Sequence, residues 1–263
     1  MALSHGSLFS GIGGIDLGLE WAGFETAWQV ENNEFCNQVL EKQWPGVQRF
    51  LDVRSVGKDN LKPVNLISGG FPCQDISIGA QFKERGLGGS RSGLWVEYAR
   101  IVRELQPAWV LVENVPNLKD FGADIVISDL EAAGYSCWTS VVGVDAFKAP
   151  FKRHRVFILA HHNSHGTRSI GEGMAAGWTL SPECQRALAQ ACQDWNYWQH
   201  ELGAGNARSI SGAEESESDS YARGLRTIYG VPDGLDRLKA LGNACTPVIP
   251  AIIGSFIQNY EKV

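Results

Sequence analysis

The chain has 263 residues, of which 44% are hydrophobic and 20% are charged, and this composition is typical of a globular protein rather than a disordered or fibrous one. Its net charge is −6, from 23 basic and 29 acidic residues, which excludes a protein that coats nucleic acid with bulk positive charge. No stretch approaches the roughly 18 continuous apolar residues of a membrane span, and the N-terminus lacks the pattern of a secretory signal. Six scattered cysteines without a C-x-x-C pair predict free thiols in a reducing cytosolic compartment.

Short apolar runs alternate with amphipathic stretches along the first 160 residues. Strands are predicted at Ser7–Ser10, Thr26–Glu31, Asn65–Ser68, Trp109–Glu113 and Val156–Ala160. Helices are predicted around Leu17–Trp21, over Glu34–Trp44, Gly93–Leu105 and Ile125–Ala133, and after Pro247. The alternation predicts an α/β fold with a doubly wound, mostly parallel sheet, in which ligands bind beyond the carboxyl ends of the strands.

The composition changes after His161. Residues 161–220 hold three basic and eight acidic residues, together with the polar run Glu214–Ser220 and a predicted helix near Pro182–Gln193. We therefore expect a catalytic and cofactor-binding body formed by residues 1–160 plus 236–263, and a small irregular lobe at residues 161–235. His161, His162 and His165 have no cysteine or acid at ligand spacing beside them, so no metal site is predicted.

A glycine-rich turn directly follows the first predicted strand. Its candidate ligand-binding residues are Phe9, Gly11, Ile12, Gly13 and Gly14. Asp16 stands where a dinucleotide-binding turn has its third glycine, and no phosphate-type Gly-Lys-Ser/Thr follows, so an adenosyl ligand without a pyrophosphate fits better. Glu31 ends the next strand at the spacing of an acid that binds ribose hydroxyls, and Asp52 ends a third strand as a candidate acceptor for an adenine amino group. A tight strand-to-helix turn and a solvated acid are the alternatives.

The next motif combines a thiol with a stiff turn at a strand end. Pro72, Cys73 and Gln74 follow Gly69-Gly70-Phe71, which gives this thiol a more specific setting than that of a buried hydrophobe. The glycine-rich stretch Gln81–Ser92 contains Lys83, Arg85 and Arg91 and is predicted to be a loop that closes over an anionic polymer. The alternative is an inert thiol beside a surface loop.

Three further polar groups complete the pattern. Glu113 follows the buried run WVLV, where partial desolvation raises the pKa of a carboxyl and suits it to donate a proton. Arg153 and Arg155 alternate at a strand edge and are candidates to bind a carbonyl oxygen, a phosphate or Glu113. Asn243 precedes the last helix as a helix cap or a ligand contact.

Together these motifs resemble the cytosine-5 DNA methyltransferase family, in the family's own order over residues 7–160 and 235–256. The resemblance is carried by F-x-G-x-G-G at Phe9–Gly14, by Glu31 and Asp52, by Gly70–Gln74 (GFPCQ), by Glu113–Val115 (ENV), by Arg153-x-Arg155 and by Gly242-Asn243. Phe151 occupies the position of a glutamine in the family's arginine motif. Gly230–Leu241 looks like the short phage- and prophage-type members.

The resemblance implies an S-adenosylmethionine-dependent methyltransferase with a Rossmann-like fold and a target-recognition lobe at residues 161–235. Phe9, Gly11–Gly14, Glu31, Asp52, Pro72 and Asn243 would bind the cofactor, while Cys73, Glu113, Arg153 and Arg155 would act on a flipped-out cytosine. Gln74, Lys83, Arg85 and Arg91 would contact DNA. The implied partners are double-stranded DNA and a cognate restriction endonuclease, for a monomeric bacterial or phage-encoded cytoplasmic protein. A transfer-RNA methyltransferase and a catalytically silent DNA-binding module stay open as alternatives.

Overall fold

The computed structural model of the chain describes residues 2–72, 93–143, 153–165 and 244–262, apart from the side chains of Asp120 and Phe121. Within these ranges one seven-stranded sheet has the strand order β3-β2-β1-β4-β5-β7-β6. Its strands are β1 (Ser4–Leu8), β2 (Glu25–Val30), β3 (Gln48–Phe50), β4 (Leu66–Gly69), β5 (Trp109–Asn114), β6 (Tyr135–Gly143) and β7 (His154–His162). The five neighbouring strands β3, β2, β1, β4 and β5 are parallel, and β7 runs antiparallel to both β5 and β6. This confirms the predicted mostly parallel, doubly wound sheet.

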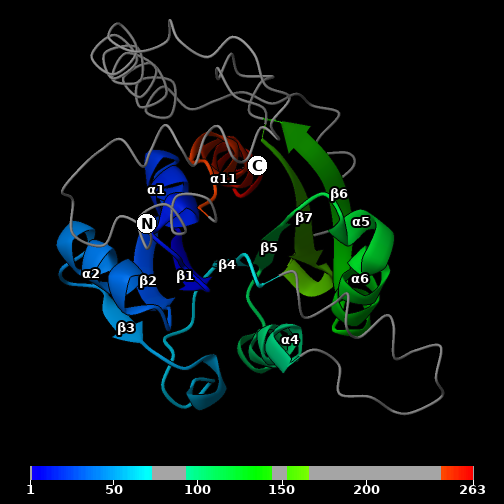
Figure 1. The fold of residues 1–263 in the computed structure, drawn as a ribbon. Helices are drawn as coiled ribbons and strands as arrows, with labels where there is room; N and C mark the ends of the chain where they lie inside the picture. Colours follow the sequence, from blue (N-terminus) through cyan, green and yellow to red (C-terminus); the bar gives the residue numbers. More distant parts are fainter. Residues whose placement is uncertain (1, 73–92, 144–152, 166–243, 263) are drawn as a thin grey trace, which may run out of the picture.

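Helices cover both faces of this sheet (Figure 1). They are α1 (Gly14–Trp21), α2 (Glu34–Gln43), α4 (Gly93–Leu105), α5 (Leu118–Phe121), α6 (Ala123–Ala132) and α11 (Val248–Tyr260). Two 3₁₀ turns, η1 (Val53–Ser55) and η3 (Asn163–His165), follow β3 and β7. None of the helices in the described ranges is long and apolar enough to cross a membrane.

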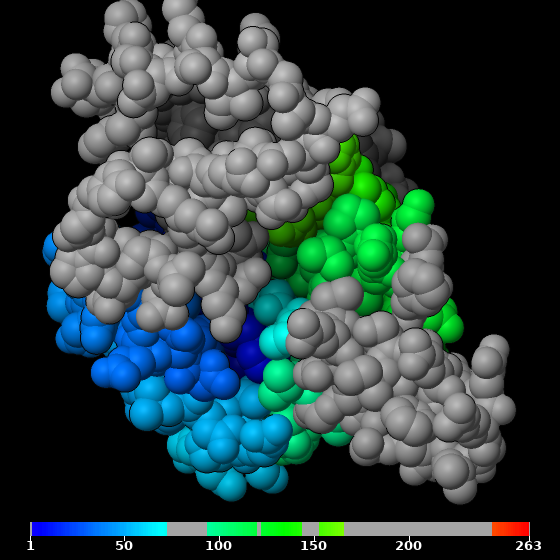
Figure 2. Space-filling view, viewed as in Figure 1, coloured from blue at the N-terminus to red at the C-terminus, as the bar shows by residue number. Residues whose placement is uncertain are grey.

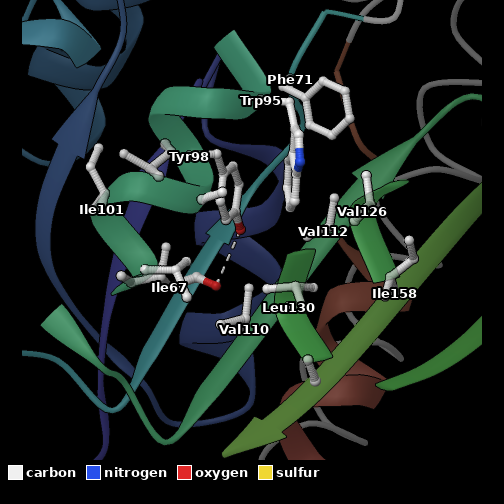
Figure 3. Packing of buried hydrophobic residues seen from close by; sticks show 14 of the residues in the cluster. Ile67, Phe71, Trp95, Tyr98, Ile101, Val110, Val112, Val126, Leu130 and Ile158 are labelled. Atoms are coloured by element: carbon white, nitrogen blue, oxygen red, sulfur yellow. Dashed lines mark hydrogen bonds between the residues drawn. The ribbon is translucent and has the colours of Figure 1, made fainter. Parts of the chain in front are cut away.

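The face of the sheet under α4 and α6 carries the larger apolar core (Figure 3). Strand residues such as Ile67, Val110 and Ile158 are fully buried there against Trp95 and Tyr98 of α4. The buried Tyr98 hydroxyl shares its single proton between the carbonyls of Leu111 (3.0 Å) and Ile67 (3.4 Å). Because buried hydroxyls need partners, these bonds fix α4 across β4 and β5, the strands that end at the candidate site.

The opposite face is covered by α1 and α11, which pack directly against each other. A Cβ on Gly18 of α1 would overlap the Pro247 carbonyl, and a Cβ on Gly254 of α11 would come within 2.7 Å of the Ala22 Cβ. Helices approach this closely only where a side chain is absent. The C-terminal helix therefore packs on the N-terminal half of the chain, and a helix after Pro247 is what the apolar pattern predicted.

Strand boundaries differ from the prediction mainly at β1 and β6. β1 ends at Leu8 rather than Ser10, because Phe9 already adopts a left-handed backbone with φ of 55° and starts the turn. β6 was not predicted, since it lies at the edge of the sheet and its alternately exposed residues lack a continuous apolar run. The predicted helix at Pro182–Gln193 lies outside the described residues.

Candidate active site

Two turns meet at the point where the chain reverses its winding direction. β1 and β4 are neighbours near the middle of the sheet. On the β1 side the sheet continues with β2 and then β3, and on the β4 side it continues in the opposite direction with β5. The carboxyl ends of β1 and β4 therefore flank the crevice where open α/β sheets bind ligands. The glycine turn Phe9–Gly14 follows β1, and the segment that begins with Gly70 follows β4. In the space-filling view, the blue N-terminal part and the green part after residue 93 lie to either side of the cyan end of β4 (Figure 2).

The glycine turn requires its glycines for different reasons. Gly13 has a φ of 84°, and a Cβ there would overlap the Trp44 ring, while a Cβ on Gly14 would overlap the Cys245 carbonyl. Gly11 has a φ of 57°, but a Cβ on it would meet no atom within 4 Å. Open space therefore lies beside Gly11, and the half-buried Ile12 follows it. A ligand can approach the backbone closely at this point.

Glu31 is bound to the glycine turn. It directly follows β2 and is 9% exposed. The Gly11 amide donates to Glu31 Oε2 over 2.7 Å, and the Asn33 amide donates to Oε1 over 2.8 Å. Each carboxylate oxygen keeps a second lone pair. Glu31 can therefore hold the turn and also accept hydrogen bonds from the hydroxyls of a bound sugar.

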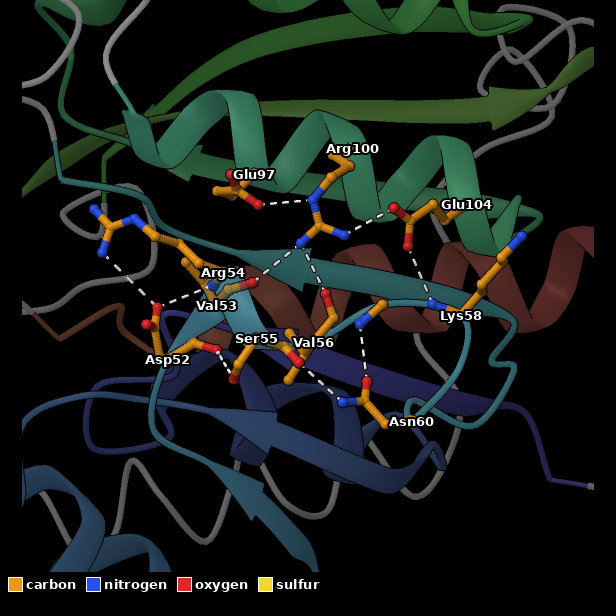
Figure 4. Close-up of polar contacts among 11 residues, drawn as sticks. Asp52, Val53, Arg54, Ser55, Val56, Lys58, Asn60, Glu97, Arg100 and Glu104 are labelled. Atoms are coloured by element: carbon orange, nitrogen blue, oxygen red, sulfur yellow. Dashed lines mark hydrogen bonds and ion pairs between the residues drawn. The ribbon is translucent and has the colours of Figure 1, made fainter.

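Asp52 lies near the same edge of the sheet but in a more open setting. It caps the 3₁₀ turn η1, accepting a hydrogen bond from the Arg54 amide at 2.9 Å, and its side chain is 54% exposed. Arg100 of α4 holds this turn by donating to the Val53 carbonyl (3.2 Å) and the Val56 carbonyl (2.7 Å), as Figure 4 shows. Asp52 is a turn acid, as the alternative interpretation had it, and its position leaves it free to face a ligand as well.

The turn after β4 leads to the predicted nucleophile. The buried Asn114 side chain, at the end of β5, donates to the Phe71 carbonyl at 2.9 Å. Phe71 packs its ring against Trp95, with 5.3 Å between ring centroids, and Pro72 is exposed. The backbone just before Cys73 is therefore fixed to β5. Sequence reasoning placed Asn114 in a motif but gave it no role, and only the strand order brings it to Phe71.

Glu113 is a buried acid at the carboxyl end of β5. It is 7% exposed, and Arg155 Nε lies 2.9 Å from its Oε1. Burial raises the pKa of Glu113, while the charges of Arg155 and Arg153 oppose that rise. A Cβ on Gly70 would come within 2.5 Å of Glu113 Oε2, so this glycine gives the carboxyl its place. Arg155 therefore makes the contact with Glu113 that the sequence offered, while Arg153 acts on this carboxyl through its charge.

Arg153 extends the same cluster to the C-terminal segment. Its Nη2 donates to the Ala244 carbonyl, one residue before the buried thiol of Cys245. Burial and then the charge of Glu113 raise the pKa of Cys245 well above its ordinary value. Since the Cys245 carbonyl also packs against Gly14, residues 244–246 connect the acid–arginine cluster to the glycine turn.

Several predicted residues lie outside the described ranges. They are Cys73, Gln74, Lys83, Arg85, Arg91, Asn243 and most of the predicted lobe at 161–235. Within the described ranges, no group of three or more metal-binding side chains is found. His161 packs on the Trp109 ring, with 4.3 Å between centroids.

Comparison with known proteins gives a consistent result. The family model of the C-5 cytosine-specific DNA methylase matches residues 3–196. Type II methyltransferase M2.BsuMI of Bacillus subtilis is 38% identical over 162 residues, which cover 59% of this chain and 41% of that protein. M.HhaI of Haemophilus parahaemolyticus is 32% identical over 160 residues, 59% of this chain and 48% of that one. The chain thus matches about half the length of these curated relatives.

Solved structures show the same fold. A protein of an E. coli prophage, described as a DNA modification methyltransferase, has a TM-score of 0.65 and 18% identity, with full coverage of both chains. The S. pombe Dnmt2 methyltransferase has a TM-score of 0.63 and 16% identity, covering 98% of this chain and 99% of its own.

Proposed function

The chain belongs to the C-5 cytosine-specific DNA methylase family, and on that basis we propose that it transfers a methyl group from S-adenosylmethionine to carbon 5 of cytosine in double-stranded DNA. Cys73 is the proposed nucleophile. Glu113, Arg153 and Arg155 are the proposed groups that hold and activate the base. The protein would act in the bacterial cytoplasm, where its DNA lies.

One arrangement carries this proposal. β4 and β5 are parallel neighbours, so the chain that leads to Cys73 and the side chain of Glu113 leave the sheet at the same edge. Asn114 joins these two segments by its hydrogen bond to the Phe71 carbonyl, and Gly70, which has no side chain, lets the Glu113 carboxyl lie close to the segment after β4. A thiol and a buried acid at neighbouring strand ends suit chemistry on two sides of one small planar ring.

The described residues also fit the cofactor. When bound, S-adenosylmethionine supplies an electrophilic methyl group on a sulfonium centre. Phe9, Gly11 and Glu31 would hold its adenosine part, because open space lies beside Gly11 and the Glu31 oxygens have free lone pairs. Asp52 would accept a hydrogen bond from the adenine amino group, and Pro72 and Asn243 would complete the cofactor site.

The chemistry follows from the weak nucleophilicity of cytosine carbon 5. The Cys73 thiolate forms a bond to ring carbon 6, and the electron pair displaced from the ring double bond makes carbon 5 nucleophilic enough to take the methyl group. Glu113 donates a proton to ring nitrogen 3, which stabilises the adduct. A base then removes the proton from carbon 5, the Cys73–carbon 6 bond breaks and releases the thiolate, and the proton on nitrogen 3 returns to Glu113, which restores the neutral ring.

Glu113 is suited to this proton transfer by opposing influences. Burial favours its neutral form, and Arg155 favours the carboxylate that remains after the proton has left. The arginines would also bind the base oxygen. Because a thiol cannot reach cytosine carbon 6 within the stacked duplex, the base must be flipped out, and Gln74, Lys83, Arg85 and Arg91 are the proposed DNA contacts.

Transfer of a labelled methyl group tests the proposal. We expect wild type to label duplex genomic DNA at cytosine carbon 5 and to leave transfer RNA unlabelled. The Cys73→Ala variant should lose transfer while it still binds S-adenosylmethionine. Labelling of transfer RNA alone would assign the chain to RNA, and methyl transfer by Cys73→Ala would rule out the covalent route.

A further inference from the structure

A polar layer is buried beneath α1, in a place where the rest of the sheet face is apolar. His5, Ser7, Asp16 and Gln29 are each at most 1% exposed. Farther along the same face, strand residues such as Trp109 pack in the apolar cluster beneath α1 and α11. Buried polar side chains reduce stability unless they are fully hydrogen-bonded, so this layer calls for an explanation beyond packing.

Asp16 lies at the centre of this layer and uses both of its carboxylate oxygens. Ser7 Oγ donates to Oδ2 over 3.0 Å, and Gln29 Nε2 donates to Oδ1 over 2.9 Å. Gln29 Oε1 in turn accepts a hydrogen bond from Arg49 Nη1 at 3.2 Å, and Arg49 also donates to the Trp44 carbonyl. One carboxylate therefore connects α1 directly to β1 and β2, and indirectly to β3.

Each of these attachment points lies two residues from the glycine turn or its acid. Ser7 precedes Phe9 by two residues, Gln29 precedes Glu31 by two, and Asp16 follows Gly14 by two. Movement of any of these three elements would shift the Gly11 amide relative to the Glu31 carboxylate that accepts its hydrogen bond. Asp16 thus holds in register the three backbone segments from which the proposed cofactor site is built.

The burial of Asp16 has a thermodynamic cost. Desolvation raises its pKa from 3.8 to about 6, against the opposing effect of its two hydrogen bonds. The charged groups that act on it are Glu20 on α1, through its charge, and Arg49 on β3, through the shared Gln29. Among the described residues, the side chains that hydrogen-bond to the Asp16 carboxyl are the neutral Ser7 and Gln29, and its own backbone amide also donates to it, so no cation pairs with it directly. A residue that lowers stability but joins three ligand-binding segments is better explained by the site than by the fold.

We propose that Asp16 is a positioning residue for the cofactor, which holds the glycine turn and Glu31 in register through its hydrogen bonds to Ser7 and Gln29. The inference rests on the proposed use of S-adenosylmethionine. It assigns Asp16 an effect on cofactor affinity rather than on the methyl-transfer step.

Calorimetric binding of S-adenosylmethionine to the full chain, with kcat at saturating cofactor, tests this role. Asp16→Ala should raise the Kd about tenfold or more, since hydrogen bonds to a charged group commonly contribute that much. Its kcat should stay within about threefold of wild type, because no contact to the reacting base is removed. Asp16→Asn keeps the shape; its oxygen can accept from Gln29 and its NH2 group can donate to Ser7 Oγ, so its Kd should stay within about threefold of wild type.

Thr26→Val is the matched control. It breaks the hydrogen bonds that link His5 to Thr26 and Thr26 to Glu20, within the same layer but away from the turn, and should leave the Kd unchanged. If Asp16→Ala fails to fold, Ser7→Ala removes one of the two hydrogen bonds and should raise the Kd in the same direction.

Two results separate this inference from the proposed function. An unchanged Kd in Asp16→Ala, or an equal loss in Thr26→Val, overturns the role of Asp16 while cofactor use stands. A wild-type chain that binds no S-adenosylmethionine overturns both.

Discussion

Glu113 shows how a single residue acquires its chemistry from its neighbours. The side chain is buried, lies against Arg155 and is also influenced by the charge of Arg153. It fits in this place only because Gly70 has no side chain. Its properties therefore depend on three strand ends, those of β4, β5 and β7.

Replacing Glu113 with glutamine should separate chemistry from folding. The amide keeps the shape but cannot donate a proton in the same way, so we expect kcat to fall by about 10²- to 10⁴-fold, the usual contribution of an acid–base group. The Kd for S-adenosylmethionine should not change. Single-turnover methyl transfer and calorimetry measure these quantities, and Glu25→Gln, at an exposed position, is the control. Full activity of Glu113→Gln would remove Glu113 from the mechanism.

Gly70→Ala tests whether the position of the Glu113 carboxyl depends on the missing side chain of Gly70. The added Cβ would lie 2.5 Å from Glu113 Oε2 and must displace it. A displacement of about 1 Å near a reacting centre can lower the rate about 100-fold, so kcat should drop by at least tenfold. Gly46→Ala is the matched control, since a Cβ there meets nothing within 4 Å. Equal kcat values for the two variants would contradict the proposed geometry.

The buried Asp16 carboxyl predicts a specific pH dependence of stability. Its folded-state pKa of about 6 exceeds the ordinary 3.8, so the folded chain binds this proton more tightly than the unfolded chain does. The resulting stabilisation is fully present below about pH 3.8 and is lost as the pH rises through 6, a difference of about 3 kcal/mol. Asp16→Asn should remove this contribution. As the pH rises from 4 to 7, the unfolding free energy of the variant should therefore increase relative to that of wild type, by up to about 3 kcal/mol. Urea denaturation at each pH measures it, and parallel curves for the two proteins would refute it.

At the scale of whole elements, Arg100 links α4 to the turn that carries Asp52 (Figure 4). Glu97 (2.7 Å) and Glu104 (2.8 Å) on the same helix orient the guanidinium, which then donates to two carbonyls of the turn around η1. Because Arg100 lies on α4 and bonds to the turn that follows Asp52, its contacts relate the position of α4 to the proposed adenine site.

Arg100→Met should loosen that turn. It leaves the carbonyls of Val53 and Val56 without their donor, and we expect a loss of about 1–3 kcal/mol in unfolding free energy. Hydrogen exchange of the amides at 53–56 should increase. Arg103→Met, on the same helix, is the control: its ion pair with Asp129 spans 4.0 Å and its side chain is 46% exposed, so its loss should be below about 1 kcal/mol. Equal destabilisation by both variants would show that the Arg100 contacts add nothing.

Across the whole molecule, the sequence predicted most of the sheet but only part of what organises the site. Buried parallel strands such as Trp109–Asn114 are continuous apolar runs, and the motifs follow directly after them. Both the strands and the motifs could therefore be predicted from the sequence. The edge strand β6 has no such run. The roles of Asn114 and Arg100 depend on strand order and helix packing, which bring together residues 43 and 47 positions apart.

The net charge illustrates the same limit. The overall −6 argues against a basic coat, yet residues 61–119, which include the proposed nucleophile and DNA-contacting residues, carry seven basic and five acidic residues. DNA binding by so local a basic surface should be weak and salt-dependent outside the specific site. The segment 161–220 is acidic by contrast, with eight acidic residues and only Arg168, Arg186 and Arg208 as basic ones.

The central claim is that this chain methylates cytosine in DNA at carbon 5 through Cys73. It is tested most directly by expressing the chain in a host without cytosine methylation and sequencing that host's DNA after bisulfite treatment. We expect protected cytosines confined to one short recurrent sequence for wild type, and none for Cys73→Ala expressed at the same level. A fully converted genome from cells that contain folded wild-type protein would contradict it, as would the same protected cytosines in the Cys73→Ala strain.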